Sequence, residues 1–181
     1  MTDVYDYISP LKNSIMAMFV GDRIGSGASR DVYEVVGDPS IIMKVERTAR
    51  TFHNQTEHLI WQEMKDWPIS DWFAPVTAID SYGNVLFQKQ TQPFECEKDF
   101  KAAVTRTRGG VLPDVFADIH YANFGILDGR VTCHDYGYHY FFEQMARNLS
   151  INAGYITIDE HPVAAPEPYD TTEGGQFVLD L

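Results

Sequence analysis

The sequence has few cysteines and no long apolar run. Its two cysteines, Cys96 and Cys133, are too few for a disulfide framework, and they form no C-x-x-C pair. Reduced thiols in a reducing compartment are the simplest interpretation. No apolar segment is long enough for a transmembrane helix, and the N-terminal stretch lacks the basic start and apolar core of a secretory signal. We therefore expect a cytoplasmic protein that does not enter a membrane.

Basic residues are also scarce. The chain has 14 Lys and Arg against 26 Asp and Glu, which gives a formal net charge of −12. Surfaces that bind nucleic acids or anionic membranes need clustered Lys and Arg to contact phosphates, so the balance argues against both kinds of partner. A partner with a basic surface would suit the chain better, although the charge also has a simpler explanation in solubility.

Apolar residues are plentiful, at 44% of the 181 residues, with 13% aromatics and 22% charged residues. This composition is that of a folded protein, and the length fits one compact domain or two small lobes that share a cleft. No internal repeat is visible. The segment 159–181 is rich in Pro, Asp, Glu and Gly without periodicity, so we expect an irregular acidic tail there.

Apolar periodicity and turn residues predict a mixed α and β chain. In chain order, the predicted elements are an amphipathic N-terminal element over 1–20, strands over 31–36 and 41–45, a helix within 47–67, two strands within 73–92, a helix from Glu97 to Val104, a hairpin over 124–135 and a helix within 141–150. Pro68 should end the first of these internal helices, and "TRTRGG" should form a polar loop after the second. "DG" at the hairpin tip supplies residues that accept a positive φ.

A glycine-rich turn, "GSGAS", precedes the strand over 31–36. The turn comprises Gly25, Ser26, Gly27, Ala28 and Ser29. Glycines at such a turn let backbone N–H groups approach phosphate oxygens that a Cβ would keep away. A glycine-rich turn without a ligand is common too, so this motif alone does not identify a nucleotide site.

Lys44 stands within the otherwise apolar strand "IIMKV". An ammonium buried there without a partner would be costly, so the sequence predicts a counter-charge. Glu57, on the following helix, is the candidate, with Glu63 as the alternative, and a nucleotide phosphate could share the charge. On an alternating strand, Lys44 could instead point to solvent.

The segment "DIHYANFGILDGRVTCHDYG" places Asp118, Asn123 and Asp135 around the predicted hairpin. Asp118 could accept a proton from a hydroxyl, while Asn123 and Asp135 offer the oxygen ligands that Mg²⁺ prefers alongside substrate phosphates. His120 and His134 flank the same segment and keep a zinc site open as an alternative.

These motifs together resemble the protein kinase-like fold. "IGSGASRDVY" resembles the glycine-rich loop, "IIMK" the strand with the phosphate-binding Lys, "DIHYAN" the catalytic loop and "DYG" the metal-binding D-F-G, all in the same order. The D-x-H-x-x-N spacing is closer to aminoglycoside phosphotransferases and other atypical kinases than to eukaryotic protein kinases. Small bacteriophage-encoded and effector-type minimal Ser/Thr kinases are similar as well, and the likeness covers residues 21–140.

The resemblance implies an α+β fold of two lobes: an N-lobe with its N-terminal extension over 1–92, built of an antiparallel sheet and one helix, and a strongly truncated C-lobe over 93–158. It implies ATP and Mg²⁺ as cofactors. Asp118, Lys44 and Glu57 would be catalytic, and Asn123 and Asp135 would bind the metal. ATP would be bound by the following residues: Gly25, Ser26, Gly27, Ala28, Ser29, Lys44, Lys89, Gln90 and Gln92.

The chain also departs from the kinase pattern. Arg30 stands where the loop has its third glycine, His and Arg are missing before Asp118, and no activation segment or A-P-E follows Tyr136. The usual substrate platform is therefore absent or rebuilt. There is no room for the helical insertions with which aminoglycoside-type enzymes bind small molecules, so a protein substrate is expected.

Two function classes remain. One is a minimal ATP-dependent protein kinase, acting on a host protein, in the host cytoplasm if the chain is viral, or on its own residues such as Tyr169, Thr171 and Thr172. The other is a catalytically inactive kinase-like module that inhibits a host protein through its acidic surface.

Overall fold

A computed structural model of the chain describes residues 19–47, 51–116, 118–139, 142–143, 145–146 and 148–149. Of the sequence predictions, the N-terminal element over 1–20 falls almost wholly outside these residues, and the tail over 159–181 falls entirely outside them. The helix expected within 141–150 is only partly covered, and the residues described there are helical.

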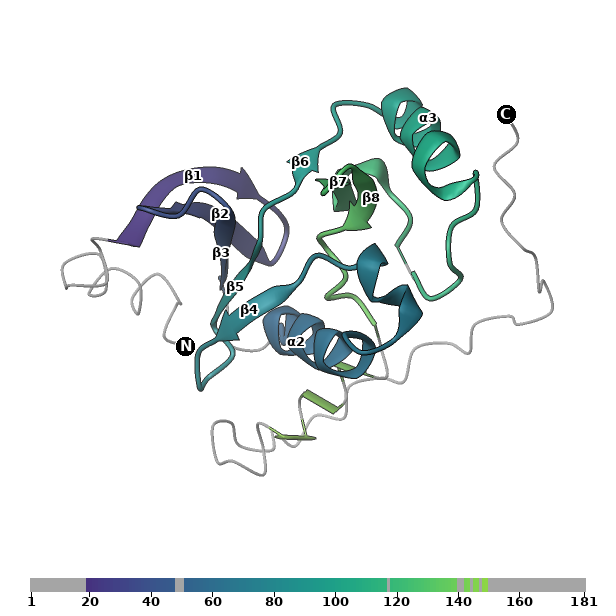
Figure 1. The fold of residues 1–181 in the computed structure, drawn as a ribbon. Coiled ribbons are helices and arrows are strands. Elements are labelled where there is room, and N and C mark those ends of the chain that lie inside the picture. The colour runs from purple at the N-terminus through teal and green to yellow at the C-terminus, as the bar shows by residue number, and fades with distance from the viewer. Residues whose placement is uncertain are drawn as a thin grey trace.

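The first half of the described chain forms a five-stranded sheet (Figure 1). Every neighbouring pair is antiparallel, in the order β1-β2-β3-β5-β4. The strands are β1 (Val20–Ser26), β2 (Arg30–Val35), β3 (Ile41–Glu46), β4 (Val76–Ile79) and β5 (Val85–Lys89). The four strands expected from sequence within 31–92 are therefore confirmed.

The strand β1 was not predicted, and its composition explains why. "VGDRIGS" lacks the alternation of a half-buried strand, and its pairing with β2 is interrupted by two register shifts. At Gly21 an added Cβ would lie 2.9 Å from Glu34 Cβ. The glycine therefore permits a close approach of the two strands that hydrophobic periodicity does not reveal.

The helix α2 (His53–Met64) lies against β3, β4 and β5, on the side of the sheet that faces the rest of the protein (Figure 1). The helix lies within the predicted segment 47–67 and ends at Met64, three residues before the end of that segment. Pro68 then occupies the first position of a short 3₁₀ helix, η2 (Pro68–Trp72), where its missing N–H costs nothing.

The second half of the chain forms a small antiparallel sheet of β6 (Gln92–Pro93), β7 (Phe124–Leu127) and β8 (Arg130–Cys133). The hairpin between β7 and β8 turns at Asp128 and Gly129, whose φ values are 49° and 78°, as the "DG" signal predicts. A 3₁₀ turn, η3 (Tyr121–Asn123), leads into β7.

The helix α3 (Glu97–Arg108) packs against β8 and is one turn longer than predicted. The prediction of a loop over "TRTRGG" is wrong for its first four residues, which form the last turn of α3. The hydroxyl groups of Thr105 and Thr107 donate hydrogen bonds to the backbone carbonyl oxygens of Lys101 and Ala103, one helical turn earlier. The Arg108 side chain donates to Val131 O and to the Asp71 carboxylate. Gly109, with φ 71°, then ends the helix. A polar helix end was thus mistaken for a loop.

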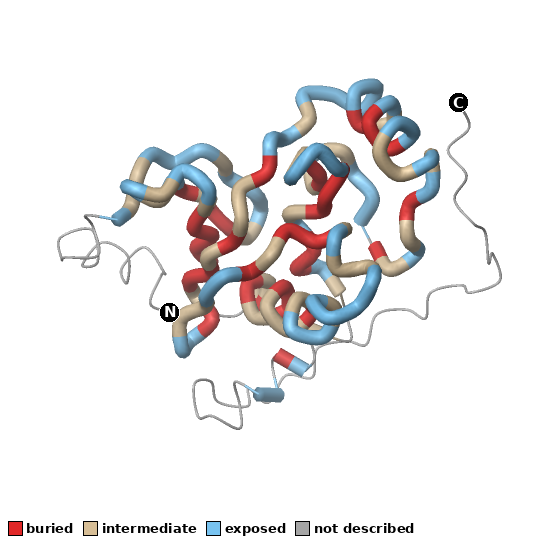
Figure 2. Tube along the Cα trace, viewed as in Figure 1, coloured by how far each residue is buried: buried red, intermediate tan, exposed pale blue. Residues whose placement is uncertain are grey.

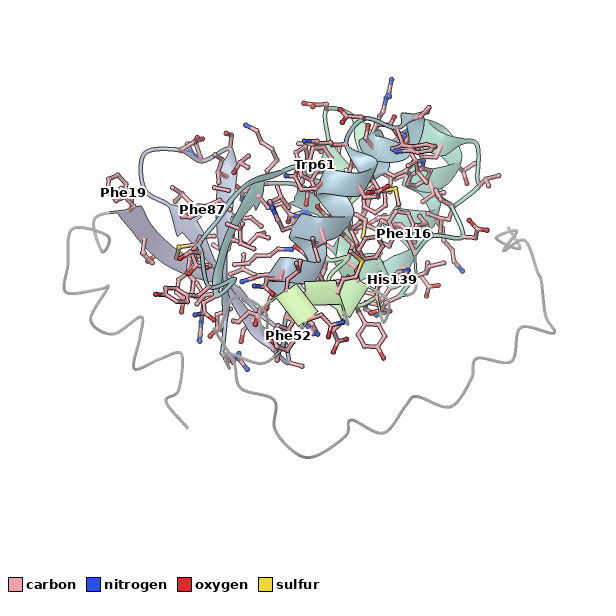
Figure 3. The ribbon with its side chains drawn as sticks, turned by 90° about the horizontal axis from the view of Figure 1, so that it is seen from below. Phe19, Phe52, Trp61, Phe87, Phe116 and His139 are labelled. Carbon is pink, nitrogen blue, oxygen red and sulfur yellow. The ribbon has the colours of Figure 1, made fainter. Side chains whose placement is uncertain are left out.

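Buried segments of the chain meet between α2, α3 and the β7–β8 hairpin (Figure 2), and most of the buried aromatic residues belong to this core, Phe116 among them (Figure 3). Phe116 contacts both Phe73 and Phe124, with ring centroids 5.1 and 5.3 Å apart, and Phe73 meets Tyr136 edge to face. This core joins the two sheets and positions the loops between them. The fold is α+β, and within the described residues no helix is long and apolar enough to cross a membrane.

The two cysteines are not joined. Cys96 is exposed at the start of α3, whereas Cys133 is buried, and burial raises the pKa of its thiol well above the usual range. Two free thiols agree with the interpretation from sequence.

The approach of β6 to β7 leads to the first prediction. A Cβ at Gly125 would lie 2.6 Å from Gln92 O and 2.5 Å from Thr91 Oγ1. Because the backbone cannot yield as a flexible side chain does, Gly125→Ala should lower the free energy of unfolding by about 1–3 kcal/mol in urea denaturation.

Gly27→Ala is the matched control, since only Arg30 O, at 3.8 Å, lies near its Cβ position. Equal stabilities of the two variants would contradict the close packing of β6 against β7.

Candidate functional site

Lys44 and Glu57 form a buried ion pair between β3 and α2. Lys44 is 2% exposed, and its Nζ lies 3.0 Å from Oε1 and 2.9 Å from Oε2 of Glu57, which is fully buried. Lys44 also donates to the carbonyl oxygen of His134. The pair expected from sequence is present, and Glu63, the alternative partner, is exposed on α2.

Arg30 is the third charged member of this cluster, and sequence analysis identified it only as a departure from the glycine pattern. It is 5% exposed. Its Nη2 donates to Glu57 Oε1 at 2.8 Å and to Asp135 Oδ1, and its Nη1 reaches Asn54 Oδ1 at 3.3 Å. Strand alternation places Arg30 on the same face as Val32. The pairing of Val32 with Lys44, which brings that face to the cluster, is a feature of the fold that the sequence does not show.

The four charges of the cluster balance. Burial lowers the pKa of Lys44, and Glu57 opposes that shift. Desolvation opposes ionisation of Asp135, but the Arg30 and Lys44 cations hold its pKa well below the usual range. Arg30, Lys44, Glu57 and Asp135 are thus two cations facing two anions, and the Tyr136 backbone N–H adds a bond to Glu57 Oε1 at 3.2 Å.

A cleft of about 680 Å³ opens beside this cluster, a size that suits a small-molecule ligand. One wall comes from the glycine-rich turn, β2 and β3, and the other from the segments before and after the β7–β8 hairpin. The residues expected from sequence that line it are Gly25, Ser26, Gly27, Ala28, Ser29, Lys44, Gln90, Asp118, Asn123 and Asp135.

Other expected residues lie elsewhere. Lys89 and Gln92 are not part of the cleft wall: Lys89 Nζ reaches Ser40 Oγ at 3.2 Å, and Gln92 pairs with Ile126 in the small sheet. Glu57 stands behind Lys44 and does not line the cleft. Sequence reasoning missed the apolar wall made by Ile24, Val32 and Ile42, because isolated apolar residues on strands carry no motif.

The glycine-rich turn is held at both ends. Gly27 N donates to Arg30 O at 2.8 Å, Ser26 Oγ accepts from Arg47, and Ser29 Oγ lies 2.7 Å from His53 Nδ1. Where Gly27 would carry a Cβ, the one atom within 4 Å is Arg30 O, at 3.8 Å, which is ordinary van der Waals contact. Internal packing therefore does not demand glycine there, which leaves room for a ligand to approach the backbone.

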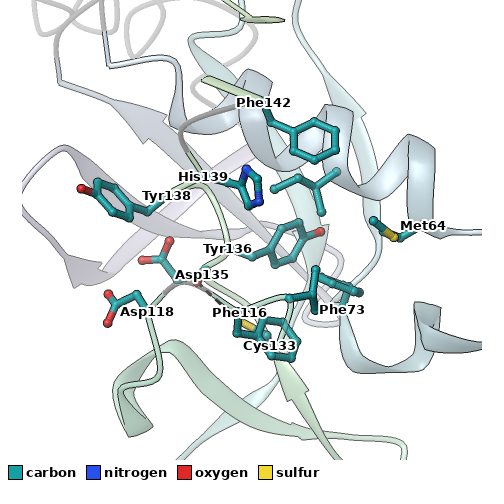
Figure 4. Close-up of a pocket in the computed structure, with 12 residues that line it drawn as sticks. Met64, Phe73, Phe116, Asp118, Cys133, Asp135, Tyr136, Tyr138, His139 and Phe142 are labelled. Atoms are coloured by element: carbon teal, nitrogen blue, oxygen red, sulfur yellow. Dashed lines mark hydrogen bonds between the residues drawn. The ribbon is translucent and has the colours of Figure 1, made fainter. Parts of the chain in front are cut away.

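Asp118 and Asn123 come from the segment before β7. Asn123 Nδ2 donates to Asp118 O at 3.2 Å, and Asn123 O accepts from the backbone N–H groups of His134 and Asp135 at 2.8 and 3.2 Å. These bonds join the two ends of the hairpin. Asp118 and Asp135 also line a second, smaller pocket, which shares Tyr138 with the cleft and is otherwise mostly apolar, and in that view their carboxylates point to the same side, near Tyr138 (Figure 4).

The donors that face the cleft suit a hard cation such as Mg²⁺. The Asn123 side chain uses its Nδ2 to donate to Asp118 O, so its amide oxygen remains available as a metal ligand. One carboxylate oxygen of Asp135 accepts from Arg30, but the side chain is 51% exposed and can still be reached by a cation. Within the described residues, no three His, Cys, Asp or Glu side chains are arranged to hold a metal by themselves. Two oxygen donors are enough only where substrate phosphates complete the coordination.

A zinc site is disfavoured because the nearby histidines are engaged. His134 has both ring nitrogens in bonds: Nδ1 lies 2.7 Å from Thr91 Oγ1 and Nε2 lies 2.9 Å from Ala122 O. Burial, followed by the Lys44 charge, lowers the pKa of His134 to about 4, so its ring is neutral at pH 7. His120 Nδ1 accepts from Ala122 N at 3.3 Å and caps η3.

No protein-family model matches this chain, and no curated protein is found that matches its sequence. The assignment of a function therefore depends on the geometry of the site.

The buried charges lead to a stability prediction. Glu57→Gln should lower the free energy of unfolding by about 3–5 kcal/mol, because Arg30 and Lys44 would be left buried without their shared anion. Urea denaturation at pH 7 measures this.

Glu63→Gln makes the same chemical change on an exposed position of α2 and should stay within about 0.5 kcal/mol of wild type. A small effect of Glu57→Gln would mean that the buried cluster does not carry the stability ascribed to it.

Proposed function

We propose that this chain is an ATP- and Mg²⁺-dependent phosphotransferase of the protein kinase-like fold, and specifically a minimal Ser/Thr protein kinase. The observation that carries the proposal is that one cleft gathers a glycine-rich turn, a Lys44–Glu57 ion pair and the polar groups of Asp118, Asn123 and Asp135. Each of these serves a known need of phosphoryl transfer, which depends on positioning and on compensation of charge.

In this proposal the described N-terminal residues up to Gln92 act as the β-rich lobe and those after it as the reduced lobe. The adenine ring would lie against the apolar wall of Ile24, Val32 and Ile42, and the phosphates beneath the glycine-rich turn. Lys44, oriented by Glu57, would donate to phosphate oxygens. Asn123 and Asp135 would hold Mg²⁺, which neutralises charge on the phosphates when bound.

Asp118 is the proposed base. Its exposed carboxylate would accept the proton of a substrate hydroxyl while the hydroxyl oxygen bonds to the γ-phosphorus. The bond between that phosphorus and the bridging oxygen of the β-phosphate breaks at the same time, and ADP leaves with the bond's electron pair. The Asn123 side chain, bonded to the Asp118 carbonyl, would fix the position of the base.

A protein is the favoured source of the hydroxyl. The segment between α3 and η3 is short, and the described residues of the second lobe contain no helical insertion that could enclose a small acceptor. A folded partner brings its own surface to the open side of the cleft, and the chain's net charge of −12 suits a basic one.

A noncatalytic kinase-like module is the second candidate, and one observation favours it. Arg30 already occupies an oxygen of Asp135, the residue that would hold the metal. In such a module the acidic surface would bind and inhibit a partner, and no transfer would occur.

Thermal denaturation with and without MgATP tests nucleotide binding. MgATP at about a hundred times its Kd should stabilise the folded protein by about 2.7 kcal/mol, a rise of several degrees in Tm for a chain of this size. Lys44→Ala and Asp135→Asn should each abolish the rise, because they remove a phosphate donor and a metal ligand.

Lys65→Ala and Asp114→Asn are the matched controls, since both make the same charge change at exposed positions outside the cleft. They should keep the full rise. If millimolar MgATP leaves the Tm of wild type unchanged, the nucleotide site is refuted.

Asp118→Asn separates the two candidate functions. With radiolabelled ATP and either the protein itself or a basic protein as acceptor, this change should reduce the transfer rate about 10²–10⁴-fold while the MgATP-dependent rise in Tm is retained. Wild type that binds MgATP but transfers no label to any acceptor would support the noncatalytic module.

A further inference from the structure

Arg30 connects parts of the chain that are distant in sequence. Arg30 lies on β2, and its guanidinium donates hydrogen bonds to Glu57 on α2 and to Asp135 after β8. We propose that Arg30 is a positioning residue that takes the place of a divalent cation at Asp135 in the free protein, so that metal binds Asp135 only together with phosphate. This inference rests on the proposed function in so far as Asp135 is the metal ligand.

The geometry of the guanidinium suits this role. Its planar fork carries five N–H donors, so it can bridge two carboxylates as a divalent cation does, which a lysine ammonium does with less geometric control. Arg30 Nη2 donates hydrogen bonds to both Glu57 Oε1 and Asp135 Oδ1, and Nη1 donates to Asn54 Oδ1. The third glycine of a kinase loop could make none of these bonds.

Charge explains why metal alone would be excluded. Arg30 and Lys44 already balance Glu57 and Asp135, and both cations are buried. A divalent ion at Asp135 would add two positive charges beside them, and of the two proposed metal ligands it would gain only one further donor, the neutral oxygen of Asn123.

Phosphate reverses this balance. A nucleotide brings several negative charges into the cleft, where Arg30 and the glycine-rich turn are both part of the wall. Phosphate oxygens can then accept the Arg30 N–H bond that Asp135 accepts in the free protein. Asp135 is thereby free to bind the metal that arrives with the phosphates. Arg30 thereby fixes the order in which the ligands enter.

Mn²⁺ binding to the nucleotide-free protein tests this order directly. The full chain is titrated with Mn²⁺ in phosphate-free buffer, and the signal of the free aqueous ion is followed by electron paramagnetic resonance. Asp135→Asn should leave the weak Mn²⁺ affinity of wild type unchanged, because Arg30 holds the carboxylate. Arg30→Gln should raise the affinity at least about tenfold, and Arg30→Gln combined with Asp135→Asn should lose that gain.

Arg23→Gln is the matched control. It removes the same charge from an exposed position of β1, where Arg23 Nη1 lies 3.8 Å from Asp31 Oδ1. This variant should leave the Mn²⁺ affinity unchanged. Arg30→Lys, which keeps one cation near Asp135, should bind Mn²⁺ less tightly than Arg30→Gln. A purely structural role for Arg30 would produce neither the gain nor its dependence on Asp135.

Two results would overturn the proposal. One is a wild type whose Mn²⁺ affinity falls on Asp135→Asn, a comparison that holds even if Arg30→Gln does not fold. The other is a folded Arg30→Gln that binds Mn²⁺ no better than Arg23→Gln. No nucleotide is present in the titration, so its failure is distinct from a failure of the MgATP experiment.

Discussion

The buried carboxylate of Glu57 is the group on which the arrangement of this protein depends. It accepts from Lys44 on β3, from Arg30 on β2 and from the backbone N–H of Tyr136 after β8. A fully buried anion is stable only when its acceptor capacity is used, so each of these elements must be in place for α2 to pack as it does. One side chain thus couples the large sheet to the segment that follows the small one.

Other contacts between the two sheets reinforce this coupling. Tyr136 Oη donates to Ala74 O at 2.7 Å, and Ala74 N donates to Cys133 O at 2.8 Å. An added Cβ at Gly137 would lie 2.8 Å from His53 O, so a glycine is required where the chain passes the first turn of α2. Asp135 lies among these fixed points, and its position is therefore set by backbone packing as much as by its bond to Arg30.

The sequence predicted elements that have strong local signals and missed those determined by contacts. β3 and β5 were found because their apolar runs end at turn residues, and the β7–β8 hairpin because Asp128 and Gly129 tolerate positive φ. β1 was missed because it is held by pairing with β2 and not by its own pattern. The end of α3 was missed because Arg108 gains its partners, Val131 and Asp71, from distant segments.

The same division applies to the candidate site. Lys44 and Glu57 could be paired from sequence, because a lysine in an apolar strand is costly to bury without an anion and the next helix offers Glu57, with Glu63 as the alternative. Arg30 could not, because a residue next to a glycine-rich turn is usually exposed, and its burial depends on Asp135, which is 105 residues away. A motif comparison registers Arg30 only as a missing glycine, whereas the fold gives it three acceptors.

The net charge of the chain gives Arg30 further importance in the proposed function. A protein with a charge of −12 repels a free polyphosphate more strongly than its less charged Mg²⁺ complex, although salt limits this repulsion to distances of about 8 Å. Attraction must then come from short-range donors inside the cleft, where Arg30 and Lys44 are the Arg and Lys side chains of the described wall. Both are already committed to carboxylates. A ligand that supplies phosphate and metal together offers phosphate oxygens to the two cations and a metal to Asp135, whereas free metal adds only positive charge and a free polyphosphate adds only negative charge.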